Sequence, residues 1–121
     1  MAEFTDRELD VMSVLWTIES GTVNEVRDRL DEDFAYNTVL TVLRTLEAKG
    51  HVRHEEEGKA QRYFPTVRRE EAGTSAITRL LDKVFAGNAE AMLTHLVSDK
   101  RITRKRLAAM RKLLDEKLGG E

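Results

Sequence analysis

The spacing of the apolar residues changes once within the first 66 residues, and this change constrains the fold more than any other feature of the sequence. Before Gly50, apolar residues recur every three or four positions, which is the period of an amphipathic helix. Beyond it, the stretches 51–54 and 61–65 alternate around an acidic turn that contains Gly58, which is typical of a β-hairpin. The pattern predicts helices at about residues 5–18, 23–32 and 36–49. Three helices followed by a hairpin are the order of a winged helix-turn-helix.

Two of these helices begin at a capping box, a motif that satisfies free backbone N–H groups at a helix start. Thr5 stands three residues before Glu8, and Thr22 stands three residues before Glu25. In each pair the hydroxyl accepts a hydrogen bond from the backbone of the glutamate, and the carboxylate accepts one from the backbone of the threonine. Gly50 ends the third helix, because glycine readily adopts the left-handed turn that follows a helix.

Residues 69–121 predict a second region made of three short helices, with breaks at Gly87 and at 99–103. Each helix carries one apolar stripe. The stripes contain Ile77, Leu80, Leu81 and Val84; Ala89, Met92, Leu93, Leu96 and Val97; and Leu107, Met110, Leu114 and Leu118. About 50 residues rarely bury enough surface to fold alone, so we expect a second copy of the chain to cover these stripes. The alternative is that the helices fold back on the first region.

The fold class that follows is mainly α, with a winged helix-turn-helix domain over residues 1–68 and a three-helix dimerisation domain over residues 69–121. We expect the dimer contacts to come from Ile77, Leu80, Leu81, Val84, Met92, Leu93, Leu96, Leu107, Met110 and Leu114. No run of about 20 apolar residues occurs, and the first ten residues lack the basic start and apolar centre of a signal peptide. We therefore expect a cytoplasmic protein without membrane insertion.

The third predicted helix has an unusual polar face. At about 100° per residue its apolar side is formed by Val39, Val42, Leu43 and Leu46. The other side lacks the acidic residues of an ordinary solvated helix, because no carboxylate occurs between Asp33 and Glu47. Arginine pairs with guanine, asparagine with adenine, and methyl groups contact thymine. We therefore predict DNA contacts from Asn37, Thr38, Leu40, Thr41, Arg44 and Thr45. The alternative is a neutral helix face without a partner.

The predicted hairpin adds three cations, Arg53, Lys59 and Arg62, for which we predict contacts with DNA phosphates. The acidic run at 55–57 would repel DNA, so we expect it to point away. Residues 1–67 contain 8 Lys and Arg against 14 Asp and Glu, a net charge of −6, whereas the rest of the chain has a net charge of +4. Because phosphate neutralisation usually supplies the affinity for DNA, this acidic balance supports an alternative, a protein-binding adaptor that binds no DNA.

The residue groups that catalysis or metal binding needs are missing from the sequence. Zero cysteines exclude disulfides and thiolate metal sites. No glycine-rich phosphate loop occurs, and no histidine is grouped with a carboxylate at a catalytic spacing. His51 and His54 have the spacing of solvated or core histidines rather than of a metal pair. We therefore expect no enzyme activity, no cofactor and no metal site.

Several motifs together resemble the BlaI/MecI family of penicillinase repressors. The resemblance extends over most of the chain and is most specific in the third helix and the hairpin. It rests on residues 8–12, 15–16, 22–26, 36–43, 49–50 and 62–65, which read Glu-Leu-Asp-Val-Met, Leu-Trp, Thr-Val-Asn-Glu-Val, Tyr-Asn-Thr-Val-Leu-Thr-Val-Leu, Lys-Gly and Arg-Tyr-Phe-Pro. The copper-responsive relatives carry a C-terminal cysteine metal motif, so the lack of cysteine excludes that branch.

The resemblance implies a dimeric repressor that binds double-stranded DNA at a two-fold symmetric operator, with half-sites resembling TACA/TGTA. It implies contacts from Asn37, Thr38, Thr41 and Arg44. It also implies control of a β-lactamase-type or cell-wall-stress operon, and inactivation when a membrane-bound sensor metalloprotease triggers cleavage of an Asn-Phe bond in the penultimate helix. The aligned pair here is His95-Leu96, which differs from that bond. Release by a small ligand and protein turnover are the alternatives.

Overall fold

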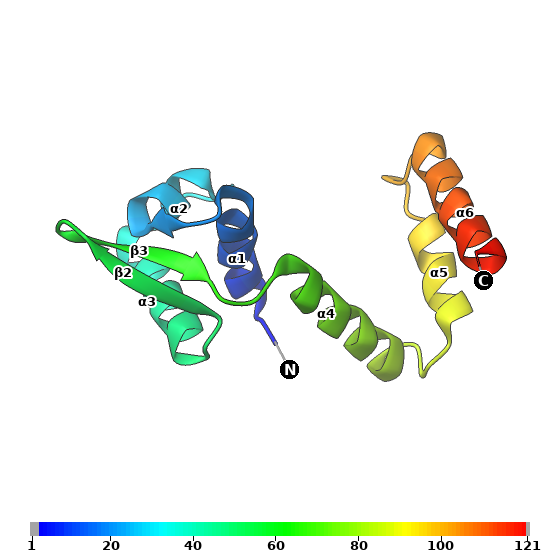
Figure 1. The fold of residues 1–121 in the computed structure, drawn as a ribbon, viewed down its shortest axis with the longest axis horizontal. Helices are drawn as coiled ribbons and strands as arrows, with labels where there is room; N and C mark the ends of the chain where they lie inside the picture. Colours follow the sequence, from blue (N-terminus) through cyan, green and yellow to red (C-terminus); the bar gives the residue numbers. More distant parts are fainter. Residues whose placement is uncertain (1–2, 121) are drawn as a thin grey trace. The chain divides into compact units, whose positions relative to one another are not determined.

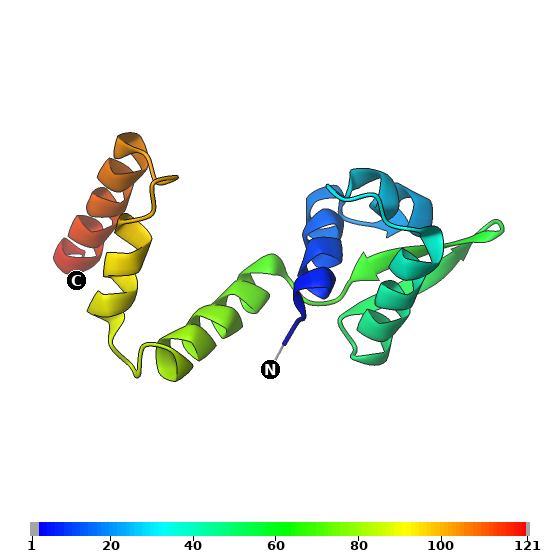
Figure 2. The same ribbon diagram turned by 180° about the vertical axis from the view of Figure 1, so that it is seen from behind.

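The computed structural model describes residues 3–120 (Figure 1 and Figure 2). Its internal contacts divide the chain into two compact units, and the boundary falls after Ile77. This boundary lies inside a helix, α4 (Arg69–Lys83), which begins one residue after the division predicted from the sequence. The division at residue 68 stays a prediction.

The first unit contains a winged helix-turn-helix, which confirms the predicted fold class. Three helices pack with a three-stranded antiparallel sheet in the order β1-β3-β2. In both views the hairpin of β2 and β3 forms the wing and extends past the helices (Figure 1 and Figure 2). The elements are α1 (Asp6–Ile18), β1 (Gly21–Thr22), α2 (Val23–Arg29), α3 (Tyr36–Ala48), β2 (Val52–Glu57) and β3 (Ala60–Pro65).

Two elements of this unit differ from the prediction. The helix α2 ends at Arg29, three residues earlier than predicted, because the backbone of Leu30 is extended, with φ −76° and ψ 144°. The side chain of Leu30 packs against the core. Its apolar character therefore fits the helical spacing of the sequence, although its backbone is not helical. The strand β1 was not predicted. It pairs with β3, and Gly21 lies opposite Tyr63.

The tip of the wing also differs from the prediction. The acidic residues 55–57 do not form the turn, because they belong to β2 and pair with β3. The chain turns at Gly58 and Lys59 instead. Gly58 has a φ of +61°, in the left-handed region that glycine adopts without steric cost. The acidic run therefore lies along the wing, and Lys59 stands at its tip.

The core of the first unit is apolar and draws on its three helices and its sheet. Its buried residues are Val11, Met12, Leu15, Val23, Val26, Val39, Leu43, Leu46, Val52 and Tyr63. Burying a side chain of this size contributes roughly 1.5–3 kcal/mol relative to exposure, so the winged helix has a core of its own. At its edge the Trp16 indole Nε1 donates a hydrogen bond of 2.8 Å to the Val67 carbonyl, which ties α1 to the segment that leads into α4.

One carboxylate lies inside this unit. Glu8 is 4% exposed, accepts a hydrogen bond of 2.9 Å from the Thr5 backbone, and lies 2.9 Å from the Lys49 ammonium. Burial raises the pKa of Glu8, but the Thr5 hydrogen bond and the Lys49 ammonium outweigh it and hold the pKa below its ordinary value. The Thr5 bond belongs to a capping box, and both predicted capping boxes are confirmed.

Replacing Lys49 with Met is expected to lower the free energy of unfolding at neutral pH by about 1–2 kcal/mol, because the Glu8 carboxylate then loses its charged partner inside the fold. A carboxylate such as Glu8, whose pKa is lower in the folded state than in the unfolded state, stabilises the fold at pH values above its unfolded-state pKa. This contribution is lost as the pH falls through the folded-state pKa. The cost of the substitution should therefore shrink as the pH falls through the folded-state pKa of Glu8, because the protonated side chain no longer needs a charged partner. Urea unfolding of both proteins from neutral pH into this acid range measures the change, and a cost that did not shrink with falling pH would contradict the assignment.

The second unit consists of the rest of α4, then α5 (Ala89–Val97) and α6 (Arg104–Gly119). Side chains cap both later helices, because Asn88 accepts a hydrogen bond from the backbone at the start of α5 and Thr103 does so at the start of α6. In α5 and α6 no residue is buried. The exposed large apolar residues of this unit are Leu80, Val84, Leu93, Leu96, Val97, Leu113, Leu114 and Leu118. Among residues 3–120, no helix has both the length and the hydropathy to span a membrane.

Candidate nucleic-acid interface

The exposed face of α3 is built as the sequence predicts. Val39, Leu43 and Leu46 are buried in the core, which fixes the rotation of the helix about its axis. The opposite face consists of the exposed residues Asn37, Thr41, Arg44, Thr45 and Ala48. Thr38 and Leu40 are half-buried at the margins between the two faces. Four of the six predicted helix contacts therefore face solvent, and the other two flank them.

A shallow groove of about 230 Å³ lies between α3 and the wing. Its lining comes from the start of α2, from α3 and from the tip of the hairpin. These residues are Thr22, Val23, Asn24, Tyr36, Leu40, Arg44, Glu56, Lys59, Ala60 and Gln61. The groove brings together predicted contact residues from two separate elements, Leu40 and Arg44 from α3 and Lys59 from the turn of the hairpin. Each wall of the groove therefore carries one cation.

Two of the four predicted cations are available to an external anion. Within residues 3–120, the exposed side chains of Arg44 and Lys59 make no ion pair. Arg53 differs, because its Nη1 lies 2.6 Å from the Glu55 carboxylate and its guanidinium lies 4.3 Å from the centre of the Phe64 ring. The first unit is acidic overall, but two positive charges without an ion-pair partner among the described residues lie on α3 and at the tip of the wing.

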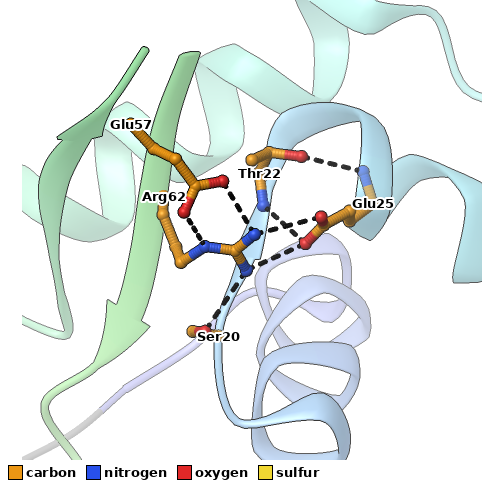
Figure 3. A network of polar contacts seen from close by, with 5 residues as sticks. All are labelled: Ser20, Thr22, Glu25, Glu57 and Arg62. Carbon is orange, nitrogen blue, oxygen red and sulfur yellow. Dashed lines mark hydrogen bonds and ion pairs between the residues drawn. The ribbon is translucent and has the colours of Figure 1, made fainter.

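The fourth predicted cation, Arg62, lies in a closed network of polar contacts (Figure 3). Its Nε and Nη2 donate to the Glu57 carboxylate at 2.8 and 3.0 Å. Its Nη1 and Nη2 donate to the Glu25 carboxylate at 2.9 and 3.1 Å, and Nη1 also donates to the Ser20 hydroxyl at 3.3 Å. The hydrogen bonds from Arg62 lower the pKa of Glu25 and that of Glu57, so both carboxylates stay ionised at neutral pH.

The acidic run of β2 is paired within the wing. Glu55 and Glu57 bind the two arginines of the hairpin, and Glu56 accepts a hydrogen bond of 3.2 Å from Gln61 on the facing strand. These pairs neutralise part of the charge that would repel DNA. The direction of the run relative to DNA stays a prediction.

Comparison with known proteins identifies this arrangement. A model of the penicillinase repressor family matches residues 4–116. The chain belongs to the penicillinase repressor family. Within it, the transcriptional regulator BlaI of Mycobacterium tuberculosis is 34% identical over 123 residues, which cover 96% of this chain and 88% of that protein.

Two solved structures from the penicillinase repressor family match the winged helix. The solution structure of the DNA-binding domain of the repressor BlaI is 32% identical with a TM-score of 0.52, and covers 57% of this chain and 87% of that one. The solution structure of the Bacillus licheniformis BlaI monomeric form in complex with the blaP half-operator is 32% identical with a TM-score of 0.50, and covers 58% and 88%. The predictions of a DNA-binding transcriptional repressor and of a protein without enzyme activity are confirmed.

Asn24, Tyr36 and Gln61 also line the groove of this family member, and they are not among the contacts predicted from the sequence. Tyr36 is 43% exposed at the first position of α3, and an aromatic residue at an exposed helix start is a signal that could have been used. Asn24 and Gln61 give no such signal, because Asn24 lies in the first turn of α2 and Gln61 lies on β3, and only the fold brings both to the groove that Arg44 lines.

The residues predicted to form the dimer differ in exposure, and all lie on α4, α5 and α6 except Val84, which directly follows α4. Ile77, Leu80, Val84, Leu93, Leu96 and Leu114 are exposed, and Leu81, Met92, Leu107 and Met110 are half-buried. The pair predicted for cleavage, His95 and Leu96, lies in the last turn of α5. His95 Nδ1 lies 3.0 Å from the Ala91 carbonyl, so the side chain contacts its own helix.

Proposed function

We propose that this member of the penicillinase repressor family binds double-stranded DNA as a homodimer at a two-fold symmetric operator and thereby represses transcription. The observation that carries the proposal is the exposed face of α3. It has no carboxylate between Asp33 and Glu47, and it holds Arg44, which makes no ion pair with any described residue, across a groove from Lys59. The solved complex of a related BlaI with the blaP half-operator supports the same conclusion.

An α-helix fits the major groove of DNA, so the exposed face of α3 is the surface that reads sequence. The guanidinium of Arg44 suits guanine, and the amide of Asn37 suits adenine. Threonine and leucine methyl groups suit the thymine methyl. We assign these contacts to Thr38, Leu40, Thr41 and Thr45. The wing then supplies contacts to phosphates, from Lys59 directly and from Arg53 once it leaves Glu55.

The exposed apolar residues of α4, α5 and α6 support a homodimer. Leu93 and Leu96 on α5, with Leu114 on α6, are 41%, 47% and 51% exposed in a single chain. Leaving apolar surface of this extent in water is costly, and a second copy of the same helices would cover it. A two-fold dimer presents two α3 helices, which is why we expect a two-fold operator.

We infer that the operator controls a β-lactamase-type or cell-wall-stress operon. We also infer that cleavage at His95-Leu96, triggered through a membrane-bound sensor metalloprotease, releases the repressor from the operator. A cut in α5 would separate the dimerisation helices and lower operator occupancy without changing α3. The pair lies in the last turn of the helix, where local unwinding costs least. Mass spectrometry of the repressor from cells, before and after a cell-wall antibiotic, tests this. A full-length chain in both samples with the target genes derepressed would exclude cleavage.

Footprinting of genomic fragments that the protein selects tests the operator itself. We expect two protected half-sites whose centres lie about one or two helical turns apart and are related by two-fold symmetry. A single protected half-site would contradict the dimeric operator. Protection without a common sequence would contradict sequence-specific binding.

Replacing Lys59 with Gln is expected to weaken binding to operator and unrelated DNA by the same factor and to reduce the salt slope of binding by about one, because a phosphate contact reads no sequence. Fluorescence anisotropy titrations over a range of salt concentrations measure both quantities. A Lys59 variant that lost affinity for the operator alone would place this side chain on a base.

A further inference from the structure

The network around Arg62 leaves its guanidinium no donor for DNA. An arginine side chain has five N–H donors. The Nε donor of Arg62 is bonded to Glu57, and the two Nη2 donors are bonded to Glu57 and Glu25. The two Nη1 donors are bonded to Glu25 and Ser20 (Figure 3). A phosphate contact from Arg62 would have to replace at least one of these bonds.

The charge of the network also argues against a phosphate contact. One guanidinium and two ionised carboxylates sum to a net charge of −1, so the cluster as a whole repels a phosphate. The Arg62 side chain is 23% exposed, whereas the side chains of Glu25 and Glu57 are 48% and 53% exposed. The carboxylates are therefore the part of this cluster that faces solvent more.

The network joins three parts of the fold. Arg62 lies on β3, Glu57 is the last residue of β2 before the turn, and Glu25 lies in the first turn of α2. The Glu25 carboxylate also accepts a hydrogen bond of 3.3 Å from the Thr22 backbone, which completes the cap of α2. Thr22 in turn pairs with Arg62 in the sheet. Arg62 therefore links the tip of the wing to the start of α2 through both its side chain and its strand.

We propose that Arg62 is a positioning residue, which fixes the wing tip against the start of α2 so that Lys59 meets the DNA backbone at a set distance from Arg44. The inference rests on the proposed DNA-binding function. It reassigns Arg62, for which the sequence predicts a phosphate contact. It also explains why an acidic residue, Glu57, stands two positions before Lys59, where charge alone would favour a neutral or basic residue.

The two roles of Arg62 predict opposite signs for the removal of Glu57. If Arg62 binds a phosphate, Glu57→Ala frees its guanidinium and removes a negative charge, so operator affinity rises. If Arg62 positions the wing, the same variant loosens the tip, and affinity falls by about threefold to tenfold despite the lost negative charge. Tighter binding by Glu57→Ala would overturn the proposal.

Glu55→Ala is the matched control. Glu55 lies on the same strand as Glu57, carries the same charge and has a similar exposure, 59% against 53%, but it binds Arg53 instead of Arg62. Its removal is expected to leave operator affinity unchanged or to raise it. If Glu55→Ala weakened binding as much as Glu57→Ala does, the effect would not belong to the Arg62 network, and the proposal would fail.

A double-mutant cycle with Lys59→Gln separates positioning from a general loss of stability. In the otherwise unchanged protein, Lys59→Gln is expected to cost about threefold to tenfold in operator affinity. In the Glu57→Ala background the same substitution should cost less than about twofold, because Lys59 no longer reaches its phosphate reliably. Fully additive losses would show that Glu57 does not act through Lys59 and would overturn the proposal.

Backbone ¹⁵N relaxation of the DNA-free protein tests the network independently of DNA binding. Glu57→Ala should increase fast motion at residues 57–61 and leave α3 unchanged, whereas Glu55→Ala should leave this tip ordered. A Glu57→Ala wing as ordered as the unsubstituted wing would overturn the proposal. If the unsubstituted protein bound no operator, the proposed function would fail, and the relaxation measurement would still decide whether Arg62 holds the wing.

Discussion

Replacing Arg44 with Ala is expected to weaken operator binding by about 1–3 kcal/mol and to reduce the preference for the operator over unrelated DNA. Arg44 is an exposed cation on the polar face of α3 and lines the groove that faces Lys59. Because the guanidinium of Arg44 is proposed to pair with a base edge, its removal deletes a contact that depends on the DNA sequence. Anisotropy titrations against the operator and against a scrambled duplex measure affinity and preference together.

A suitable control for Arg44→Ala is Arg29→Ala. Arg29 is another exposed arginine of the winged helix, but it lines a separate hollow beside α1. We expect this control to retain the preference for the operator. We also expect Arg44→Ala to keep its unfolding temperature, because the side chain makes no ion pair with the described residues. An equal loss on both duplexes would reassign Arg44 to a phosphate.

Replacing Leu80 with Asp is expected to convert the proposed dimer to a monomer and to lower operator affinity by roughly 100-fold, because joining two half-site contacts raises affinity through effective concentration. Leu80 is 42% exposed on the part of α4 that belongs to the second unit. A charge placed in an apolar dimer contact would be buried without a partner. Sedimentation velocity and operator titration measure the two effects.

Leu9→Asp is the matched control for Leu80→Asp. Leu9 lies on α1 of the first unit and is 41% exposed, almost the same as Leu80. It should leave the protein dimeric, because α1 lies outside the predicted dimer contact. A dimer that survived Leu80→Asp would contradict the assignment of dimerisation to the second unit, and so would a dimer lost in both variants.

The sequence predicted the elements of the first unit well where the signal is local. The capping boxes at Thr5 and Thr22 mark helix starts through contacts only three residues apart, and both exist. The faces of α3 follow from helical period, and the burial of Val39, Leu43 and Leu46 matches them. Patterns that extend over one turn of helix are thus readable from a single chain.

The parts that were missed depend on contacts between distant residues. The strand β1 has two residues, too few for an alternation to show, and exists because β3 pairs with it. The partners of Arg62 were hidden in the same way, since Glu25 lies 37 residues away. A basic residue in a hairpin looks like a phosphate contact until the fold shows which carboxylates bind it.

The measurement that tests sequence-specific binding of operator DNA most directly is a salt titration of the full-length protein with its operator and with a scrambled duplex of the same length. Sequence-specific binding through α3 predicts that the operator is bound at least about 1,000-fold more tightly near physiological salt. Phosphate contacts from the wing predict that both affinities fall steeply as the salt concentration rises. Equal affinities for the two duplexes, or an affinity that does not change with the salt concentration, would contradict operator binding through α3 and the wing.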